Sequence, residues 1–325
     1  MKAIHLTAYP EGAPTPDHFV AVDEPDPTPG EGEVLIETLA LGMDPAVRMR
    51  MSAQSRMGPP TPLGQAVGGR GVGRVLASDD PTFAPGDLVG GELGWRERAA
   101  LPAAALEGFA PTHLPPQAHL NALGPTGLAA WFAVDAVAPR PNDILVVAPA
   151  AGAVGSLAAQ LGRNLGARVI GIGRGETQLA YLRTLGIEAA DADGDLAALA
   201  GDVNIFIDGV GGALHDRVIQ HLAPRARVLL LGCIAGYNDA APPRYGNAAP
   251  ILFRRATMQG FLLADHMAHA PQARAALAQA IAQGALQPAE TLWHGLAQAP
   301  HAFAALFGDA APGKQIVIVK EETNG

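Results

Sequence analysis

Small residues at positions 150, 152 and 155 have the spacing of a dinucleotide-binding turn. They fit the pattern G-x-G-x-x-G, with Ala150 in the first position and Gly152 and Gly155 in the others. The apolar run 144–148 before them predicts a buried strand, and apolar residues at helical spacing follow them. In such a turn Gly152 lets backbone N–H groups approach a pyrophosphate, and Gly155 lets the helix pack closely on the strand.

This spacing favours a nucleotide site, although a tight strand-to-helix turn without a ligand has the same spacing. For a nucleotide, the first helical turn at Ala153 and Val154 would place partial positive charge at the phosphates. Arg174 ends the next predicted strand, where NAD enzymes usually carry an acidic residue. Its guanidinium suits a 2′-phosphate, so we expect NADPH rather than NADH. Glu176 is a weak signal for NADH, and a solvated surface arginine is the alternative interpretation of Arg174.

The second part of the chain supplies the elements that must position this turn. From residue 123 short apolar runs alternate with helical periodicity, which is typical of a doubly wound parallel sheet covered on both faces. The fold class is therefore α/β. The predicted strands are 144–148, 168–172, 203–208, 227–232 and 260–264, and the predicted helices are 154–165, 177–185, 212–222 and 271–283.

The first third of the chain is rich in turns and strand signals. Strands are predicted at 1–6, 33–38 and 71–76, and after the turn 85–90. Residues 315–319 predict a closing strand that returns to this part. We expect two domains, the first made of 1–122 and 289–325 and the second of 123–288.

Composition excludes several classes of protein. The 325 residues are 49% apolar and carry a net charge of −9, which indicates a globular protein and argues against a nucleic-acid partner. No apolar run is long enough to span a membrane, and the N-terminal segment does not resemble a secretory signal. Cys233 is the only cysteine, and the ten histidines lack metal-ligand spacing, so we interpret them as surface or capping residues. We expect a cytoplasmic enzyme without a metal.

Six segments, in order, are similar to those of one family. They are 41–51 (D-P-Y-M-R-x-R-M in the family), 94–97 (G-W-Q-E), 123–128 (G-M-[PT]-G-L), 150–156 (A-A-G-A-V-G-S), 208–212 (D-N-V-G-G) and 313–314 (G-K). The chain resembles the zinc-free leukotriene hydroxydehydrogenase, prostaglandin reductase and alkenal double-bond reductase branch of the medium-chain dehydrogenase/reductases. The resemblance covers nearly the whole chain.

The resemblance implies a Rossmann domain inserted into a GroES-like β domain, with the site in the cleft between them. It also implies a homodimer formed by edge pairing of the Rossmann sheets, for which 260–263 is a candidate edge. Zinc-dependent relatives carry a cysteine near the first domain's centre, a Gly-His-Glu segment and a four-cysteine lobe. None of these is present, so we do not expect a metal-assisted alcohol dehydrogenase.

The resemblance also assigns residues to the cofactor NADPH. Tyr237 matches the family tyrosine that approaches the nicotinamide ribose, and we expect it to be catalytic; a partly buried packing tyrosine is the alternative. Cys233 is most simply a small core residue, and its place near Tyr237 puts it among the candidate cofactor contacts.

Four further residues complete the cofactor assignment. Thr126 and the loop Val210–Gly211 are expected to approach the cofactor through backbone groups. Gln178 stands where the family usually has a lysine. A family tyrosine is also missing from 190–193, so Arg174 is left to bind the 2′-phosphate almost alone.

Asp44, Arg48, Met57 and Leu262 are the candidate substrate residues. Asp44 and Arg48 match the family's D-P-x-x-R, and we expect Asp44 to be mainly structural and Arg48 to lie near the mouth of the cleft. Met57 and Leu262 would give an apolar lining. Ala46 replaces a family tyrosine, which indicates that the substrate pocket has changed.

The expected activity is zinc-independent, NADPH-dependent reduction of the C=C bond of α,β-unsaturated ketones or aldehydes. An NADPH:quinone reductase on the same fold is the first alternative. The second is a catalytically quiet NADPH-binding protein. In each case the expected partner is a small molecule.

Overall fold

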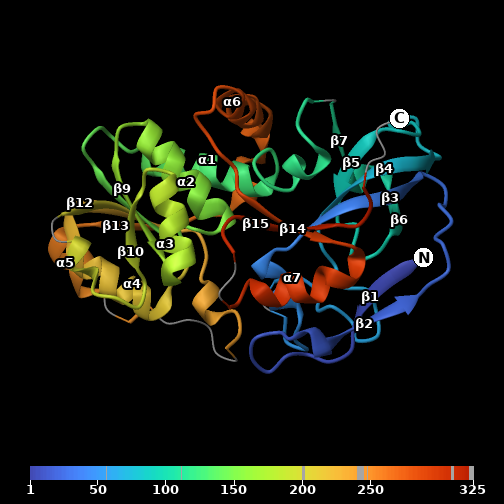
Figure 1. Ribbon diagram of the computed structural model, residues 1–325, viewed down its shortest axis with the longest axis horizontal. Coiled ribbons are helices and arrows are strands. Elements are labelled where there is room, and N and C mark those ends of the chain that lie inside the picture. The colour runs from blue at the N-terminus through green and yellow to red at the C-terminus, as the bar shows by residue number, and fades with distance from the viewer. Residues whose placement is uncertain are drawn as a thin grey trace. The chain divides into compact units, whose positions relative to one another are not determined.

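The computed structural model describes residues 1–55, 57–110, 112–199, 202–239, 245–246, 248–308 and 311–321. The chain forms two compact units (Figure 1). One holds the described residues of Met1–Asn121, Thr291–Ala310 and Lys314–Gly325, and the other those of Ala122–Glu290 and Ala311–Gly313.

The first unit is built on β-structure. A two-stranded sheet pairs β1 (Lys2–Leu6) with β2 (Phe19–Asp23). A seven-stranded sheet has the order β14-β15-β3-β4-β5-β7, with β6 also paired to β3. Its strands are β3 (Glu33–Gly42), β4 (Gly71–Ser78), β5 (Leu88–Gly91), β6 (Arg98–Pro102), β7 (Glu107–Phe109), β14 (Glu290–His294) and β15 (Lys314–Ile318).

The strand β3 shows why this sheet forms. Burial alternates along its first half and then becomes continuous, so the strand faces solvent on one side at first and is later covered on both. Its second half pairs with β15, which brings the closing segment of the chain into the sheet. The core beside it packs Trp95 against Phe19 and Phe303, with ring centroids 5.3 and 5.4 Å apart. Phe303 comes from α7 (Ala299–Ala305).

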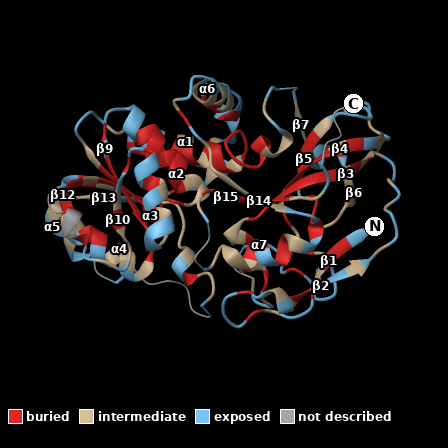
Figure 2. Ribbon diagram, viewed as in Figure 1, coloured by how far each residue is buried: buried red, intermediate tan, exposed pale blue. Residues whose placement is uncertain are grey.

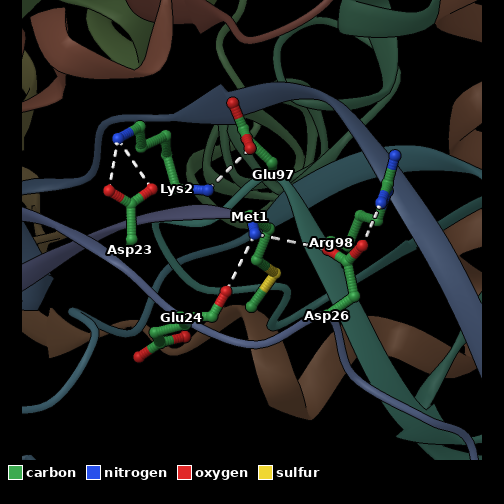
Figure 3. A network of polar contacts seen from close by, with 7 residues as sticks. All are labelled: Met1, Lys2, Asp23, Glu24, Asp26, Glu97 and Arg98. Carbon is green, nitrogen blue, oxygen red and sulfur yellow. Dashed lines mark hydrogen bonds and ion pairs between the residues drawn. The ribbon is translucent and has the colours of Figure 1, made fainter.

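A polar network joins the edges of this unit (Figure 3). The amino group of Met1 donates to the Glu24 carbonyl at 2.8 Å and lies 3.4 Å from Asp26. Arg98, on β6, pairs with the same Asp26 at 2.7 Å, so the network links β1 to β6. The Arg98–Asp26 pair is exposed and adds little stability by itself.

The second unit is a six-stranded sheet in which every pair is parallel. The order is β10-β9-β8-β11-β12-β13, which is the 3-2-1-4-5-6 order of a Rossmann fold and confirms the predicted fold class. The strands are β8 (Ile144–Ala148), β9 (Arg168–Gly173), β10 (Glu188–Asp191), β11 (Val203–Asp208), β12 (Leu222–Leu230) and β13 (Thr257–Gly260).

Helices cover this sheet, and the buried residues gather on its central strands and the inner faces of the helices (Figure 2). The helix α1 packs against α2 and α6, while α3 packs against β9 and β10. The helices are α1 (Pro125–Val137), α2 (Ala153–Asn164), α3 (Gly175–Thr184), α4 (Gly212–Val218), α5 (Ala249–Arg254) and α6 (Ala270–Ala282).

Short 3₁₀ turns join these elements in both units. They are η1 (Pro16–His18), η2 (Pro45–Arg50), η3 (Ala103–Ala105), η4 (Pro116–His119), η5 (Leu196–Leu199), η6 (Ile219–His221), η7 (Ile234–Gly236), η8 (Leu263–His269) and η9 (Leu296–Gln298). No helix among the described residues is both long and apolar enough to cross a membrane.

Three predicted elements differ from the structure, and one of them is the strand expected at 227–232, which spans Leu222–Leu230 as β12. The strand expected at 260–264 is wrong, because β13 ends at Gly260 and Leu263–His269 is a 3₁₀ helix. The apolar run Phe261–Leu263 suggested a strand, whereas β13 is an exposed edge strand with a single large apolar residue, Met258. The helix expected at 212–222 ends at Val218, and η6 follows it.

Candidate functional site

The turn after β8 is shaped by close backbone contacts. A Cβ at Gly155 would lie 2.0 Å from the carbonyl oxygen of Pro149, so only glycine fits there. Ala150 is buried, and its N–H donates to the carbonyl of Ile172 on β9 at 2.8 Å. Alanine is tolerated in the first position because the facing residue on β9 is Gly171. A Cβ added at Gly171 would lie only 2.8 Å from the Cβ of Ala150.

Gly152 has a different environment from Gly155. It is the N-cap of α2 in an extended conformation, and a Cβ there would have no neighbour closer than 3.6 Å. No side chain caps the helix. The first-turn N–H groups at Ala153, Val154 and Gly155 have no acceptor within the helix. The N-terminus of α2 therefore presents donors and partial positive charge beside an open glycine.

The closing segment of the second unit also reaches this turn. The N–H of Gly313 donates to the carbonyl of Ala151 at 2.9 Å, and Gly313 forms an isolated parallel bridge with Gly152. The sequence placed Gly313 only as part of a family motif. The structure adds that it contacts the residues expected to hold the pyrophosphate.

Arg174 is the N-cap of α3, directly after β9. Its backbone N–H donates to Gln178 Oε1 at 2.9 Å, and its Nε pairs with Asp193 Oδ2 at 2.9 Å. Both charged side chains are about two-thirds exposed, at 63% and 67%, so solvent screens the pair and it is easily exchanged. Gln178 thus contacts the backbone of Arg174, and Asp193 is a competing anion that sequence reasoning missed.

Asp208 ends β11 and is fully buried. Its Oδ1 accepts the N–H groups of Val210 at 2.8 Å and Gly211 at 2.9 Å, and its Oδ2 lies 2.7 Å from His215 Nδ1. The carboxylate therefore fixes the Val210–Gly211 loop. Because these N–H groups are already used, this loop offers surface rather than donors to a ligand.

Buried histidines correct one prediction. We expected every histidine to be a surface or capping residue, but His215 is only 1% exposed and His119 only 5%. His215 partners Asp208, and His119 stacks on Phe109 with ring centroids 3.9 Å apart. The single-sequence pattern could not reveal these partners, because the pairs form only when distant segments pack.

The loop after β12 places Cys233 and Tyr237 beside the Val210–Gly211 loop. The N–H of Ala235 donates to the carbonyl of Val210 at 3.1 Å, and that of Ile234 to Gly209 at 3.1 Å. Tyr237 is half-buried and its hydroxyl is hydrogen-bonded to Cys233. Burial, followed by the nearby Cys233 thiol, raises the pKa of Tyr237, while the backbone N–H of Cys233 opposes this. The phenol therefore stays neutral at physiological pH.

The chain is similar to known proteins in both sequence and structure. Residues 2–108 match the family model described as the N-terminal domain of oxidoreductase, and residues 153–282 match the one described as zinc-binding dehydrogenase. The NADPH-dependent curcumin reductase of Escherichia coli is 30% identical, over 97% of this chain and 95% of that protein. The crystal structure of CurA from Vibrio vulnificus in complex with NADPH is 32% identical, with a TM-score of 0.91 over 99% of this chain and 100% of that one.

The chain belongs to the zinc-free branch of the medium-chain dehydrogenase/reductases. Another relative in this branch, the NADP⁺-dependent 2-alkenal reductase of Nicotiana tabacum, is 29% identical over 98% of this chain and 96% of that protein. The first unit is thus the GroES-like part of this family's fold, and the second is its Rossmann part.

The other predicted site residues differ in how far they are buried. Thr126 is buried in the first turn of α1. Met57 and Leu262 are exposed, at 47% and 69%. Among the described residues, no group of three or more His, Cys, Asp or Glu side chains is arranged to hold a metal ion.

Asp44 and Arg48 both make structural contacts within the first unit. Asp44 pairs with Lys314, which is 3% exposed and also donates to the Met43 carbonyl at 3.1 Å. Arg48 is buried, and its guanidinium donates to the carbonyls of Pro10, Gly12 and Met51. These bonds give Arg48 a role in holding its own loops, and a substrate role for it stays a prediction.

Proposed function

We propose that this NADPH-dependent oxidoreductase reduces the C=C bond of α,β-unsaturated ketones and aldehydes. The names of two relatives, a curcumin reductase and a 2-alkenal reductase, support this substrate class. The observation that carries the proposal is the arrangement of the loops after β8, β9, β11 and β12. They contain the candidate cofactor residues at the carboxyl ends of parallel strands, where open α/β sheets bind ligands.

The residues present fit the dinucleotide. The open face of Gly152 and the first-turn N–H groups of Ala153 and Val154 suit a pyrophosphate, since a Cβ would fill that approach. Arg174 would take the 2′-phosphate by exchanging its exposed ion pair with Asp193. Cys233 and Tyr237, with the Val210–Gly211 loop, would border the nicotinamide half, and Thr126 would contribute its backbone.

When bound, NADPH supplies the hydride that the reduction requires. The chain's own residues orient the reactants and stabilise charge. Tyr237 is suited to this task because its neutral hydroxyl can donate a hydrogen bond. Asp208 fixes the Val210–Gly211 loop beside Tyr237 by accepting two of its N–H groups. The surroundings of the Tyr237 hydroxyl are therefore held by the protein rather than by solvent.

The test is consumption of NADPH by purified protein with an enone, an enal and a quinone as separate substrates. We expect turnover with the enone and enal, and mass spectrometry should show that the product has gained two hydrogens at the C=C bond. Turnover of the quinone alone would identify a quinone reductase. The unsaturated alcohol as product would contradict C=C reduction.

We also propose a homodimer formed through the edge strand β13. All four of its residues are exposed, and an open sheet edge is a template for pairing with another strand. Phe253 and Leu252 on the neighbouring α5 are 75% and 71% exposed. This apolar surface beside an open edge is typical of an interface.

A further inference from the structure

Two consecutive residues, Tyr245 and Gly246, are docked on two consecutive residues of α4. The ring of Tyr245 meets that of His215 edge to face, with centroids 4.8 Å apart and planes at 85°. The N–H of Gly246 donates to Asp216 Oδ1 at 3.1 Å, and a Cβ there would lie 2.8 Å from Asp216 Oδ2. Both contacts fix where the Tyr245 side chain can lie.

The His215 ring that supports Tyr245 is itself fixed. His215 is buried, and its Nδ1 lies 2.7 Å from Oδ2 of the fully buried Asp208. The same carboxylate holds the Val210–Gly211 loop. Asp208 thus positions both the candidate cofactor loop and the histidine on which Tyr245 packs.

This arrangement places the Tyr245 hydroxyl at the Gly211 backbone. A Cβ at Gly211 would lie 3.4 Å from the Tyr245 hydroxyl and 3.4 Å from the Cys233 Cβ. Gly211 has a φ of +71°, in the left-handed region. The same side of Gly211 therefore faces both the Tyr245 hydroxyl and Cys233, next to the residues that the proposed function assigns to the nicotinamide half.

The hydroxyl is suited to donate to a ligand. Burial, reinforced by Asp208, Cys233 and Tyr237, raises the pKa of Tyr245 to about 12, so the phenol stays protonated. The residue is 38% exposed, and among the described residues its hydroxyl has no hydrogen-bond partner. A protonated hydroxyl beside a cofactor loop is a ready donor.

We propose that Tyr245 is a second tyrosine of the cofactor site and that its hydroxyl donates a hydrogen bond to the nicotinamide half of bound NADPH. His215 and Asp216 are the positioning residues that hold it there. This inference rests on the proposed cofactor site, but not on the proposed enone or enal substrate.

The test compares Tyr245→Phe with wild type by fluorescence titration of NADPH, with no substrate present. The variant keeps the ring contact with His215 and loses only the hydroxyl. We expect Kd to rise roughly 3- to 10-fold, the usual effect of one lost hydrogen bond, with an unchanged Tm. Tyr9→Phe is the matched control, because the Tyr9 hydroxyl donates to the Thr61 carbonyl at 3.0 Å; it should leave Kd unchanged.

A Kd for Tyr245→Phe equal to that of wild type would overturn the inference, whatever its Tm. A raised Kd with an intact Tm supports it, even if wild type then fails to reduce enones and enals. Wild-type protein that does not bind NADPH would instead overturn the cofactor site and this inference together.

Discussion

Asp193 and a 2′-phosphate would compete for Arg174 at the adenine end of the proposed site. The Arg174–Asp193 ion pair is bidentate, with a second contact of 3.4 Å, and it is exposed. Breaking this pair therefore costs little free energy. A 2′-phosphate would replace the Asp193 carboxylate on the same guanidinium. On the proposed site, these two side chains would set the chain's preference for NADPH over NADH.

Arg174→Ala should lower the ratio of kcat/KM for NADPH to that for NADH by roughly 10-fold or more, because a charge-assisted contact is lost. Asp193→Asn should raise the same ratio, since it removes the competing anion. Steady-state kinetics with both cofactors measure the two variants. An unchanged ratio in Arg174→Ala would show that another residue recognises the 2′-phosphate.

Tyr237→Phe should lower kcat at least several-fold while Tm and secondary structure stay close to wild type. The half-buried ring keeps its packing, and only the neutral hydroxyl is removed. Stopped-flow measurement of a single turnover would locate the effect in the chemical step. Full activity in this variant would end the catalytic assignment and leave Tyr237 as a packing residue.

Because Asp208 is buried, replacing its partner His215 should destabilise the protein. His215→Leu would leave a fully buried carboxylate without its side-chain partner, and we expect a loss of about 3 kcal/mol or more in the free energy of unfolding. The double variant Asp208→Asn, His215→Leu should lose less, because a neutral amide still accepts the two loop N–H bonds. Denaturant unfolding measures the loss of free energy of unfolding in each variant. Equal losses of free energy of unfolding in the two variants would show that the charge on Asp208 does not affect stability.

At the scale of elements, the connection from β8 to α2 assigns opposite roles to its two glycines. Gly155 is a packing residue, since its Cβ would collide with Pro149. Gly152 caps the helix and has open space around it. On the proposed cofactor site, Gly155 would serve the fold and Gly152 the ligand, and the two roles can be separated by substitution.

Gly155→Ala should destabilise the protein by about 2 kcal/mol or more, because backbone must move to admit the methyl group. Gly152→Ala should leave Tm nearly unchanged but raise the Kd for NADPH at least several-fold, since the methyl occupies the approach to the helix N-terminus. Thermal unfolding and NADPH titration on both variants give the comparison. Unimpaired NADPH binding by Gly152→Ala would remove the pyrophosphate from this turn.

At the scale of the whole molecule, the open edge of the parallel sheet is the feature that predicts assembly. Met258→Glu adds a charge to β13 and should shift the sedimentation coefficient from dimer to monomer. Leu76→Glu, on an exposed position of β4 in the other unit, is the matched control and should leave the dimer intact. A monomeric wild type would contradict the proposed interface.

The sequence by itself determined the elements whose signals are local. The strand Ile144–Ala148 and the strand Val203–Asp208 were predicted with their observed bounds, because β-branched apolar runs are confined by turn residues. The strand Glu188–Asp191 was missed, since its residues carry little strand propensity and it forms as a neighbour of β9. Spacing also identified the turn at 150–155, because that pattern is contained within a few residues.

Only the tertiary structure decided which side chains meet. The Arg174–Asp193 pair, the Asp208–His215 pair and the docking of Tyr245 on α4 each join segments that no local pattern connects. Parallel strand order brings the loops after β8, β9, β11 and β12 to one edge, and packing then selects the partners. Contacts of this kind depend on the path of the whole chain, so they become visible only once it has folded.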